Sequence, residues 1–500
     1  MPTLSRCLTS AILVSAAYLQ AETPPDLSTD FEEWQLAEKG IIESMPDDYQ
    51  LVGRLTPRDA TQISSSLLGI GGETMDRDFT RFEAWSPYLK PLGAKRIRLQ
   101  SGWAKTETQK GKYDFAWLDR IVDGCLAAGV QPWLSLSYGN PIYEGAGGTG
   151  LGGGLPHSTE ALQAWENYVR ASIQHFGDRV ETYEIWNEAD LKHNQSQAGA
   201  YPRLYERTAR IIREEQPDAT ILALALAYVH ARPDSGLVDF VETLAAHDTL
   251  HLVDGITVHG YPANPDHGFE RHAEVQAYLS QHLPHAVIWQ GETGAPSERA
   301  PKFALKNLDW TELSQAKWDL RRALAHWSRE IPFSLFSISE MNYDQQHFDI
   351  LNTKGKLKIR PNDLSIERPK ISYFSYRNAC SLFADQRVPQ KRDTAIANHS
   401  SLYSFKIHDR ANGKQGFVFW DAASQPGDRF EAQRTDIVAT DLSLQNPVLL
   451  DLLSGLVWSL PEATLAQFGP SLSLYDMPVW DSPRVIADAQ LFDWTPLNQP

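Results

Sequence analysis

The feature of the sequence that most constrains the fold is a regular alternation of short apolar runs and longer helix-like stretches, beginning at Leu67. Each run suits a buried strand, and a polar loop and a helical stretch follow it. The predicted strands are 67–70, 96–99, 132–137, 183–186, 221–227, 255–258, 287–289 and 333–338. Eight strand–helix units over roughly 320 residues predict an α/β fold, a (β/α)8 TIM barrel with extended loops. An open doubly wound sheet usually needs fewer units, and no Gly-rich dinucleotide turn follows the first strand.

The pattern changes to period two after about residue 386, and turn pairs such as Asn412-Gly413 and Ser454-Gly455 separate the new runs. Alternating runs of this kind are typical of antiparallel strands. We expect strands at 402–407, 416–420, 448–451, 457–460, 472–475 and 479–480. The predicted organisation is a barrel over 67–386 and a C-terminal β-sandwich domain over 387–500. Residues 22–66 form a lead-in, where 49–55 and 60–64 could be strands and one could join the sandwich.

Residues 1–21 have the pattern of a secretory signal peptide. Arg6 supplies a positive charge, 11–19 is a short apolar run, and cleavage could follow Ala17 or Ala21. The run is too short to span a bilayer, and no later stretch is long and apolar enough. The sequence therefore predicts a secreted or periplasmic protein without a membrane span. Cleavage would leave two cysteines, Cys125 and Cys380, which are expected to be buried free thiols.

Composition and motifs exclude several classes of function. The net charge of −17 and pI near 5.3 argue against nucleic acid as the main partner, because phosphate binding needs a basic surface. No His-Glu-x-x-His or comparable ligand spacing occurs, and no nucleophile-elbow Gly-x-Ser-x-Gly suits a serine hydrolase. We expect no cofactor and no catalytic metal.

Two predicted strands end in a carboxylate. The stretch 183–191 (YEIWNEADL) presents Asn187 and Glu188, and 287–296 (VIWQGETGAP) presents Glu292 between glycines. As the fourth and seventh strands of a barrel, they would place both glutamates on the face where barrel active sites form. Glycoside hydrolysis needs such a pair: one carboxyl protonates the leaving oxygen, and the other attacks the anomeric carbon or activates water.

The two strand ends resemble the acid/base and nucleophile strands of the retaining glycoside hydrolases of clan A, and most of all family 39, the β-xylosidase/α-L-iduronidase family. Arg96-Ile97-Arg98, 133–140 (WLSLSYGN) and His259-Gly260-Tyr261 are similar as well. The resemblance covers roughly 67–383, and a sandwich usually follows in that family. It implies a retaining glycosidase with Glu188 as acid/base and Glu292 as nucleophile. It also implies that Asn187 contacts the sugar 2-hydroxyl and that His259 and Tyr261 surround the nucleophile.

Several other residues are candidate substrate contacts, each with an alternative interpretation. Arg98 could keep the nucleophile ionised or form a structural salt bridge. Tyr138 and Asn140 end strand three and could contact a sugar or cap a loop. Trp103, on a loop, could stack on a sugar face. Strand eight lacks the aromatic that often ends it in this clan; Glu340, which follows, could contact sugar or be a solvated loop acid.

The Gly-rich stretch 145–154 (GAGGTGLGGG) is not a phosphate cradle, because no Gly-Lys-Ser/Thr follows it. It could form a rim over the active-site mouth or be a plain flexible insertion. The sequence thus predicts a carbohydrate substrate and, first, exo action on a xylose-like sugar. An endo-glycanase is the alternative within the class, and an inactive carbohydrate-binding protein is the alternative from another class.

Overall fold

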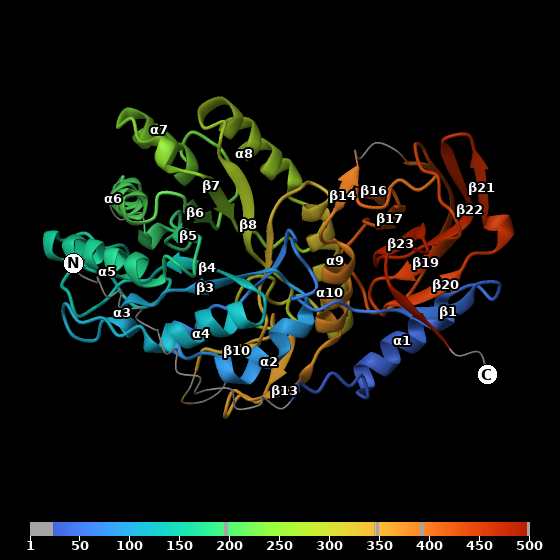
Figure 1. The fold of residues 1–500 in the computed structure, drawn as a ribbon, viewed down its shortest axis with the longest axis horizontal. Helices are drawn as coiled ribbons and strands as arrows, with labels where there is room; N and C mark the ends of the chain where they lie inside the picture. The colour runs from blue at the N-terminus through green and yellow to red at the C-terminus, as the bar shows by residue number, and fades with distance from the viewer. Residues whose placement is uncertain (1–23, 195–198, 345, 347–349, 391–394, 498–500) are drawn as a thin grey trace, which may run out of the picture.

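The computed structural model describes residues 24–194, 199–344, 346, 350–390 and 395–497. The predicted signal peptide, 1–21, lies outside the described residues. Eight parallel strands form a closed barrel in sequence order (Figure 1). The last strand closes the barrel on the first through the pairs Leu68 with Phe333 and Ile70 with Leu335. The strands are β2 (Leu68–Gly71), β3 (Arg96–Gln100), β4 (Gln131–Leu136), β5 (Thr182–Ile185), β6 (Thr220–Leu226), β7 (Gly255–Val258), β8 (Val287–Thr293) and β9 (Phe333–Leu335). The predicted (β/α)8 barrel is confirmed.

Helices surround the barrel and cover the outward face of its strands (Figure 1). They are α2 (Phe82–Leu92), α4 (Ala116–Ala127), α5 (Thr159–Phe176), α6 (Ala200–Glu215), α7 (Gly236–Ala246), α8 (Phe269–His282), α9 (Glu312–Trp327) and α10 (Ile371–Leu382). The strands are almost entirely buried because the barrel interior covers one face and the helices cover the other. Ser158 caps α5 by accepting a hydrogen bond from the amide of Ala161 at 3.1 Å.

Shorter elements extend the loops between the strands and the helices. They are α3 (Trp103–Thr106) and the 3-10 turns η1 (Met75–Arg77), η2 (Lys192–Asn194) and η3 (Leu250–Leu252). Two small hairpins occupy the connection from β9 to α10: β10 (Met341–Asn342) with β11 (Leu351–Asn352), and β12 (Leu357–Ile359) with β13 (Ile366–Pro369). The predicted eighth strand, 333–338, therefore ends three residues earlier, at Leu335.

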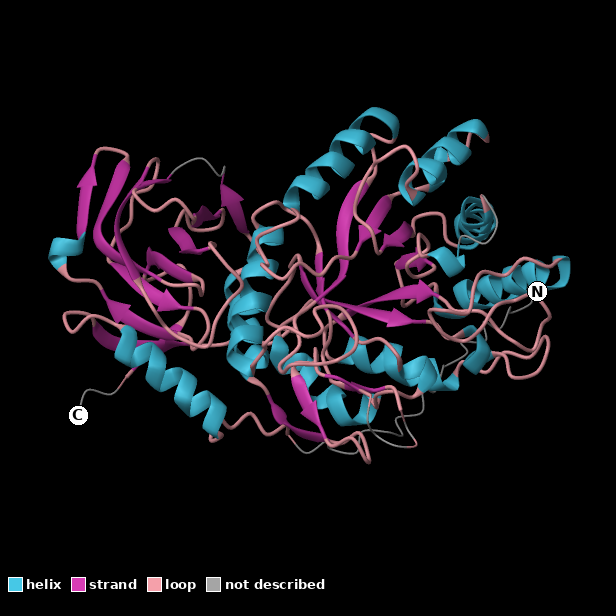
Figure 2. Cartoon of the chain, turned by 180° about the vertical axis from the view of Figure 1, so that it is seen from behind, coloured by secondary structure: helices cyan, strands magenta, loops and turns pink. Residues whose placement is uncertain are grey.

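The C-terminal part is an antiparallel β-sandwich of two sheets beside the barrel (Figure 2). The larger sheet has the order β14-β16-β17-β23-β19-β20-β1-β24, and the smaller β15-β18-β22-β21. Their strands are β14 (Arg387–Gln390), β15 (Ala395–Ala397), β16 (Leu402–Asp409), β17 (Gln415–Asp421), β18 (Gln433–Ala439), β19 (Pro447–Asp451), β20 (Leu456–Ser459), β21 (Leu465–Phe468), β22 (Ser471–Val479), β23 (Arg484–Asp488) and β24 (Trp494–Pro496); η4 (Glu462–Thr464) precedes β21. The runs predicted at 472–475 and 479–480 are not separate strands: β22 contains the first run and ends at Val479, the first residue of the second.

The N-terminal segment adds a strand to the larger sheet. β1 (Gln50–Leu55) lies between β20 and β24 and pairs antiparallel with both. The preceding helix, α1 (Glu32–Ser44), has no counterpart in the predicted elements. Its apolar residue Trp34 packs against Phe374 of α10, with ring centroids 5.0 Å apart. The stretch 60–64 forms turns, not the second strand that its composition allowed.

Cys125 and Cys380 are buried free thiols on α4 and α10, as predicted. Within the described parts of the chain, no helix is both long and apolar enough to cross a membrane.

Candidate active site

Glu188 and Glu292 lie at the carboxyl ends of β5 and β8, the fourth and seventh strands of the barrel. The backbone takes the left-handed conformation at Trp186 (φ 70°) and again at Glu188 (φ 50°). Such φ values are strained for residues with a Cβ and gather at functional sites. Trp186 is held by packing against Tyr138 and Trp165, with ring centroids 5.9 and 5.7 Å away. This turn brings the Glu188 carboxylate within 3.1 Å of His259.

The two carboxylates both lie close to His259, which directly follows β7. One oxygen of each glutamate and one ring nitrogen of His259 lie within 4.8 Å of one another. Nδ1 of His259 is 3.1 Å from Oε1 of Glu188 and 3.8 Å from Oε2 of Glu292. Burial lowers the pKa of His259, but Glu292 and the contact with Glu188 outweigh it and raise that pKa above its ordinary value.

Glu292 has a charged and a neutral donor. The Tyr261 hydroxyl donates to its Oε1 at 2.5 Å, and Nη1 of Arg98 donates to its Oε2 at 3.2 Å. Burial raises the pKa of Glu292, yet His259, Arg98 and the Tyr261 hydrogen bond together bring the pKa below its ordinary value. Glu292 is therefore ionised at neutral pH, as a nucleophile requires.

Arg98, on β3, connects this carboxylate to the barrel interior. The guanidinium is fully buried and donates to Glu184 at 2.5 and 2.8 Å. It also donates to Oδ1 of Asn187 at 2.7 Å and to Oε1 of Glu73 at 3.2 Å. These contacts use the planar fork of donors that lysine lacks. Arg98 is thus both a structural salt-bridge partner and a cation beside the candidate nucleophile.

Asn187 is held in a fixed orientation by the same network. Its Oδ1 accepts from Arg98, and its Nδ2 donates to the Tyr138 hydroxyl at 2.9 Å. Gln100 donates to the same hydroxyl at 3.3 Å, and the Arg77 guanidinium lies over the Tyr138 ring at 4.9 Å. The amide that precedes Glu188 is therefore positioned before any substrate arrives.

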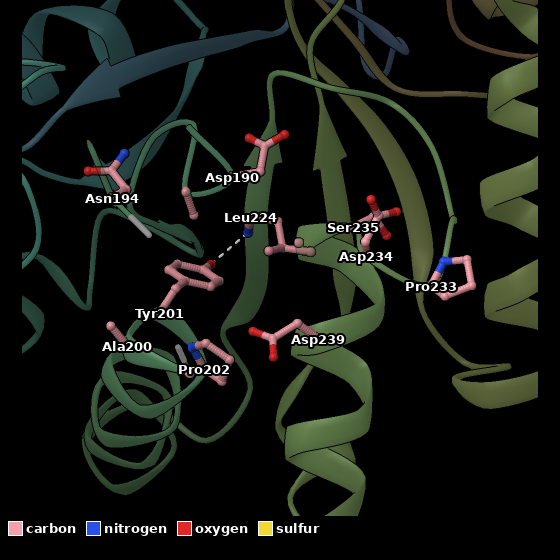
Figure 3. A pocket seen from close by; sticks show the side chains of 13 residues that line it. Asp190, Asn194, Ala200, Tyr201, Pro202, Leu224, Pro233, Asp234, Ser235 and Asp239 are labelled. Carbon is pink, nitrogen blue, oxygen red and sulfur yellow. Dashed lines mark hydrogen bonds between the residues drawn. The ribbon is translucent and has the colours of Figure 1, made fainter. Parts of the chain in front are cut away.

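Tyr201 of α6 holds the end of β5, just before the loop that carries Glu188, through hydrogen bonds of its hydroxyl. The Tyr201 hydroxyl donates to the carbonyl of Ile185 at 2.8 Å and accepts from the amide of Leu224 at 2.6 Å, the dashed bond in Figure 3. The Ala189 amide donates to the carbonyl of Leu224 at 3.1 Å. Asp190, labelled in the same view, accepts backbone amides of the loop after β6 at 2.8 and 2.9 Å. These hydrogen-bonded residues, which follow the candidate acid/base Glu188 or lie behind it, line the cavity of about 370 Å³ in Figure 3.

A separate cavity of about 280 Å³ opens over the two glutamates. Five of the residues predicted to form the site line it: Tyr138, Asn187, Glu188, Tyr261 and Glu292. Arg98 and His259 contact the carboxylates from within the barrel and are at most 1% exposed. The structure therefore brings together seven of the ten predicted site residues.

The prediction that Trp103 stacks on a sugar face is wrong. The indole is fully buried in α3, its Nε1 donates to Glu107 at 2.6 Å, and its ring packs on Tyr143, Trp165 and Tyr168. It is a core residue and offers no face to a sugar, because the loop that carries it folds back onto α5.

Asn140 and Glu340 do not contact the cavity either, contrary to the interpretation of them as sugar contacts. Asn140 is fully buried and donates to the carbonyl of Glu107 at 2.8 Å, which is the loop-capping alternative. Glu340 pairs with Lys370 at 2.5 Å and accepts the amide of Ile359 at 3.1 Å. Glu340 is therefore neither a sugar contact nor a solvated acid, since the hairpins after β9 cover it.

The cavity also contains residues that sequence reasoning missed: Glu73, Arg77, Gln100, Phe336, Tyr343 and Lys354. Glu73 lies two residues after the end of β2 and could have been found as a third carboxylate at a strand end. Phe336 follows β9 and supplies an aromatic at the end of the eighth strand. Tyr343 and Lys354 lie in the hairpins after β9, where no periodic pattern points to a site. Burial raises the pKa of Glu73 to about 7, with Arg98 opposing and Glu292 adding to the shift.

The Gly-rich loop reaches the cavity, as expected for a rim. Leu151 lines the cavity, and a Cβ at Gly150 would lie 3.7 Å from Nη1 of Arg77. Glycine is required where this loop folds on itself, because a Cβ at Gly139 would approach the carbonyl oxygen of Ala146 to 2.1 Å.

Glu188, His259 and Glu292 form the one cluster of metal-ligand side chains among the residues that the structure describes. Two cationic groups already face these oxygens: Arg98 contacts Glu292, and the raised pKa of His259 favours its protonated form. The donor set is therefore better suited to proton transfer than to binding a further cation.

No protein-family model matches the chain. A β-xylosidase of Geobacillus stearothermophilus is 26% identical over 165 residues, 31% of this chain and 32% of that relative. The chain thus matches about a third of the relative's length.

Three solved structures have the same overall fold. A family 39 glycoside hydrolase from Bacteroides cellulosilyticus WH2 aligns with a TM-score of 0.63 and 18% identity, over 85% of this chain and 81% of that one. The family 39 enzyme of Xanthomonas axonopodis pv. citri gives 0.57 and 15%, over 90% and 97%. A monomeric β-xylosidase from Caulobacter crescentus CB15 gives 0.55 and 15%, over 87% and 97%. The similarity to clan A and family 39 that the glutamate motifs predicted therefore extends to the fold of barrel and sandwich.

Proposed function

We propose that this protein is a retaining glycoside hydrolase that cleaves O-glycosidic bonds in a poly- or oligosaccharide. The observation that carries the proposal is the close pair of Glu188 and Glu292 at the ends of the fourth and seventh barrel strands, facing one cavity. The partial sequence match to a β-xylosidase and the shared fold support it.

In the first step, Glu292 attacks the anomeric carbon while Glu188 donates its proton to the leaving oxygen. The bond from the anomeric carbon to that oxygen breaks, and an ester bond to Glu292 forms. In the second step, Glu188 takes a proton from water, whose oxygen attacks the same carbon and releases Glu292 as carboxylate. Asn187, fixed by Arg98 and Tyr138, is placed to hold a sugar hydroxyl beside this carbon.

The separation of the pair supports retention of configuration. Carboxyl groups of retaining enzymes lie about 5–5.5 Å apart, and those of inverting enzymes about 6.5–9.5 Å, because inversion needs room for a water. Oxygens of Glu188 and Glu292 lie within 4.8 Å of each other, which favours the covalent route.

The size of the cavity favours exo action on a terminal sugar. At about 280 Å³ it is small for a ligand site, and loops from several strands enclose it. Leu151 of the Gly-rich loop, Phe303 of the loop after β8 and Tyr343 of the β10–β11 hairpin form its walls. An endo-glycanase would instead need an open groove for chain on both sides of the pair.

The test is hydrolysis of a panel of aryl glycosides, with the product anomer followed by NMR. Wild-type protein is expected to release the aglycone and to form first the anomer of the substrate. An inverted product would contradict the double displacement. Glu292→Gln should abolish turnover; full activity in that variant would rule out Glu292 as nucleophile, and inactivity of the wild type throughout would favour a carbohydrate-binding protein.

We further propose that the protein acts outside the cytoplasm, as a secreted or periplasmic enzyme. The support is the pattern of charge, apolar run and small residues over 1–21. N-terminal sequencing of protein isolated from expressing cells should begin after Ala17 or Ala21. A mature protein that begins at Met1 would contradict the proposal.

A further inference from the structure

Three carboxyl groups share the guanidinium of Arg98 beside the catalytic cavity. Arg98 pairs with Glu184 at 2.5 Å and with Glu73 and Glu292 at 3.2 Å each. The last two pairs use the same nitrogen, Nη1. Glu73 and Glu184 are at most 1% exposed, and a buried carboxyl without a charge partner takes up a proton. Which of the three is ionised therefore depends on what else each of them contacts.

Glu184 and Glu292 have donors for both of their oxygens. In Glu184, Oε1 accepts from the Thr257 hydroxyl at 2.6 Å, and Oε2 accepts from two nitrogens of Arg98. In Glu292, Oε1 accepts from Tyr261 and Oε2 from Arg98. Glu292 has further positive charge beside it, from His259 and Lys354. The hydrogen bonds and cations of the site thus serve these two carboxylates.

Glu73 has much weaker support as an anion. Its Oε1 accepts one hydrogen bond of 3.2 Å from Arg98, and its Oε2 has no hydrogen-bond partner among the residues that the structure describes. The carboxyl is also closely packed, because a Cβ at Gly71 would lie 2.2 Å from Oε2. A buried carboxylate oxygen without a donor is costly, and protonation removes that cost. Glu73 is therefore the acid that holds a proton while Glu292 is ionised.

The double displacement changes this balance, because the nucleophile loses its charge. When Glu292 bonds to the anomeric carbon, it becomes an uncharged ester and no longer balances Arg98. The repulsion that kept the proton on Glu73 is then gone as well. Glu73 already lies 3.2 Å from the nitrogen that Glu292 shares with it, so it can take over as the anion without moving.

We propose that Glu73 is a positioning residue that alternates with Glu292 as the anionic partner of Arg98: it is neutral while Glu292 is a carboxylate, and ionised while Glu292 carries the sugar. The proposal rests on the double displacement proposed above and adds a residue to that site. Arg98 thus keeps one orientation through both steps, and so does Asn187, whose Oδ1 accepts from Nη2 of Arg98 at 2.7 Å.

The proton of Glu73 is exchanged with solvent once in each direction. In the first step, Glu292 bonds to the anomeric carbon, the leaving oxygen departs with the proton of Glu188, and Glu73 releases its own proton through the cavity that it lines. In the second step, water gives a proton to Glu188 and its oxygen to the sugar, Glu292 returns as a carboxylate, and Glu73 takes a proton from solvent. The complete cycle leaves Glu73 unchanged.

The titration of Glu73 agrees with this alternation. Burial raises its pKa to about 7, while Arg98 opposes the shift and the charge of Glu292 adds to it. Ester formation removes the contribution of Glu292, so the pKa of Glu73 falls in the covalent intermediate. Tyr261 and Tyr343 also face Glu73, but burial raises the pKa of both hydroxyls and keeps them neutral.

Infrared difference spectroscopy of the trapped intermediate tests the proposal. The probes are 2-deoxy-2-fluoro-xylosyl, glucosyl and galactosyl fluorides in both anomeric forms, at about pH 6, where Glu73 is protonated in the free protein. Fluoride leaves without an acid catalyst, so Glu188→Gln is used and the titration of Glu188 does not interfere. Trapping should remove the C=O band of one carboxylic acid. Glu73→Gln, added to Glu188→Gln, should abolish that loss. The new ester band appears in both proteins and, unlike the acid band, does not shift in D2O.

Two further variants in the Glu188→Gln background serve as controls. Glu73→Asp restores a carboxyl and should regain the loss at a shifted frequency. Glu298→Gln, at an exposed acid outside the cavity lining, should leave the loss unchanged. An ester band without loss of an acid band would overturn the alternation and leave the double displacement standing. No ester on Glu292 in mass spectra, with the fluoride of a sugar whose aryl glycoside the wild type hydrolyses, would overturn the double displacement and the alternation with it.

Hydrolysis of the trapped ester separates the alternation from a purely structural role. In Glu73→Gln with Glu188 intact, the ester lacks the anion that balances Arg98, and the returning charge of Glu292 meets no ionised Glu73. The trapped variant, freed of excess probe, should therefore regain activity about tenfold faster than the trapped wild type, as for loss of one hydrogen bond between charged groups. A structural defect would slow this step, so an equal or slower rate would overturn the proposal.

Discussion

At the scale of single residues, Arg98 connects most of the site. One guanidinium contacts Glu73, Glu184, Asn187 and Glu292, so it orders the amide, neutralises buried acids and sits beside the candidate nucleophile. A lysine could not replace it, because an ammonium lacks the planar fork that reaches several acceptors at fixed angles. The lowered pKa of Glu292 is the result, because His259, Arg98, Lys354 and the Tyr261 hydroxyl together outweigh the effect of burial.

Replacing the candidate nucleophile should remove nearly all activity. Glu292→Gln keeps the size of the side chain and removes its charge, so no ester with the sugar can form. We expect kcat for an aryl glycoside to fall by at least about three orders of magnitude. Glu298→Gln, in the loop beyond β8 and outside the cavity lining, is the control and should keep wild-type rates. Equal losses in both variants would point to a general effect on folding.

Tyr261→Phe should reduce activity at the acid end of the pH profile. The lost hydroxyl donates to Glu292 and lowers its pKa, so the pKa of Glu292 rises in the variant. Glu292 must be ionised to attack, and its ionised fraction then falls at a higher pH than in the wild type. The acid limb of kcat/KM against pH should move to higher pH, with about a tenfold loss at the acid end. Tyr228→Phe, at an exposed tyrosine, should leave the profile unchanged, and an unmoved limb in Tyr261→Phe would contradict the role of the hydroxyl.

At the scale of elements, the connection from β9 to α10 changes the site most. Its two hairpins bring Tyr343 and Lys354 to the cavity wall and cover Glu340. Buried ion pairs hold this connection to the barrel helices, since Lys356 pairs with Asp319 of α9. The residues of this connection thus form part of the cavity wall, although the candidate catalytic pair lies at the ends of β5 and β8.

Asp319→Ala should destabilise the protein strongly. Both members of the Lys356–Asp319 pair are fully buried, so the change leaves an ammonium without its partner. Loss of one partner of a buried pair costs about 3–5 kcal/mol of unfolding free energy. The exposed pair of Lys110 with Glu160 offers a matched control, and Glu160→Ala should cost less than about 1 kcal/mol. Urea unfolding of the two variants measures both values; similar losses would refute the contribution of the buried pair.

At the scale of the whole molecule, the barrel and sandwich share structure from both ends of the chain. β1 comes from the N-terminal segment yet pairs with β20 and β24, and α1 packs on α10 of the barrel. Lys317 of α9 reaches Asp481, and Arg321 of the same helix pairs with Asp266, which accepts from Trp420 of β17. The sandwich therefore continues the barrel core and is not a tethered module.

Deleting the sandwich should prevent the barrel from folding. A chain ending at residue 386 leaves Lys317 without its carboxylate and β1 without its sheet neighbours. We expect aggregated protein, or a broad thermal transition without cooperativity when followed by circular dichroism. A soluble truncated protein with a sharp transition would show that the barrel is an independent unit.

The sequence by itself determined the barrel, the sandwich and the positions of Glu188 and Glu292. A buried parallel strand has to be an apolar run, and strand ends share one face of a barrel, so spacing alone predicts that two such glutamates meet. Position at a strand end also pointed to Arg98 and Tyr138, and the resemblance to family 39 added Asn187, His259 and Tyr261.

Only the tertiary structure decided which loop residues face the cavity. Trp103, Asn140 and Glu340 are residue types that often contact sugars, but each is buried against another part of the protein. Trp103 packs on the aromatic residues of α5, Asn140 donates to the carbonyl of Glu107, and Glu340 pairs with Lys370. The opposite holds for Lys354, which lines the cavity although no pattern in the sequence predicts a site residue there. Loop conformation depends on partners far apart in the chain and not on local periodicity, so the identity of the substrate is a property of the folded loops, whereas the chemistry is legible in the strands.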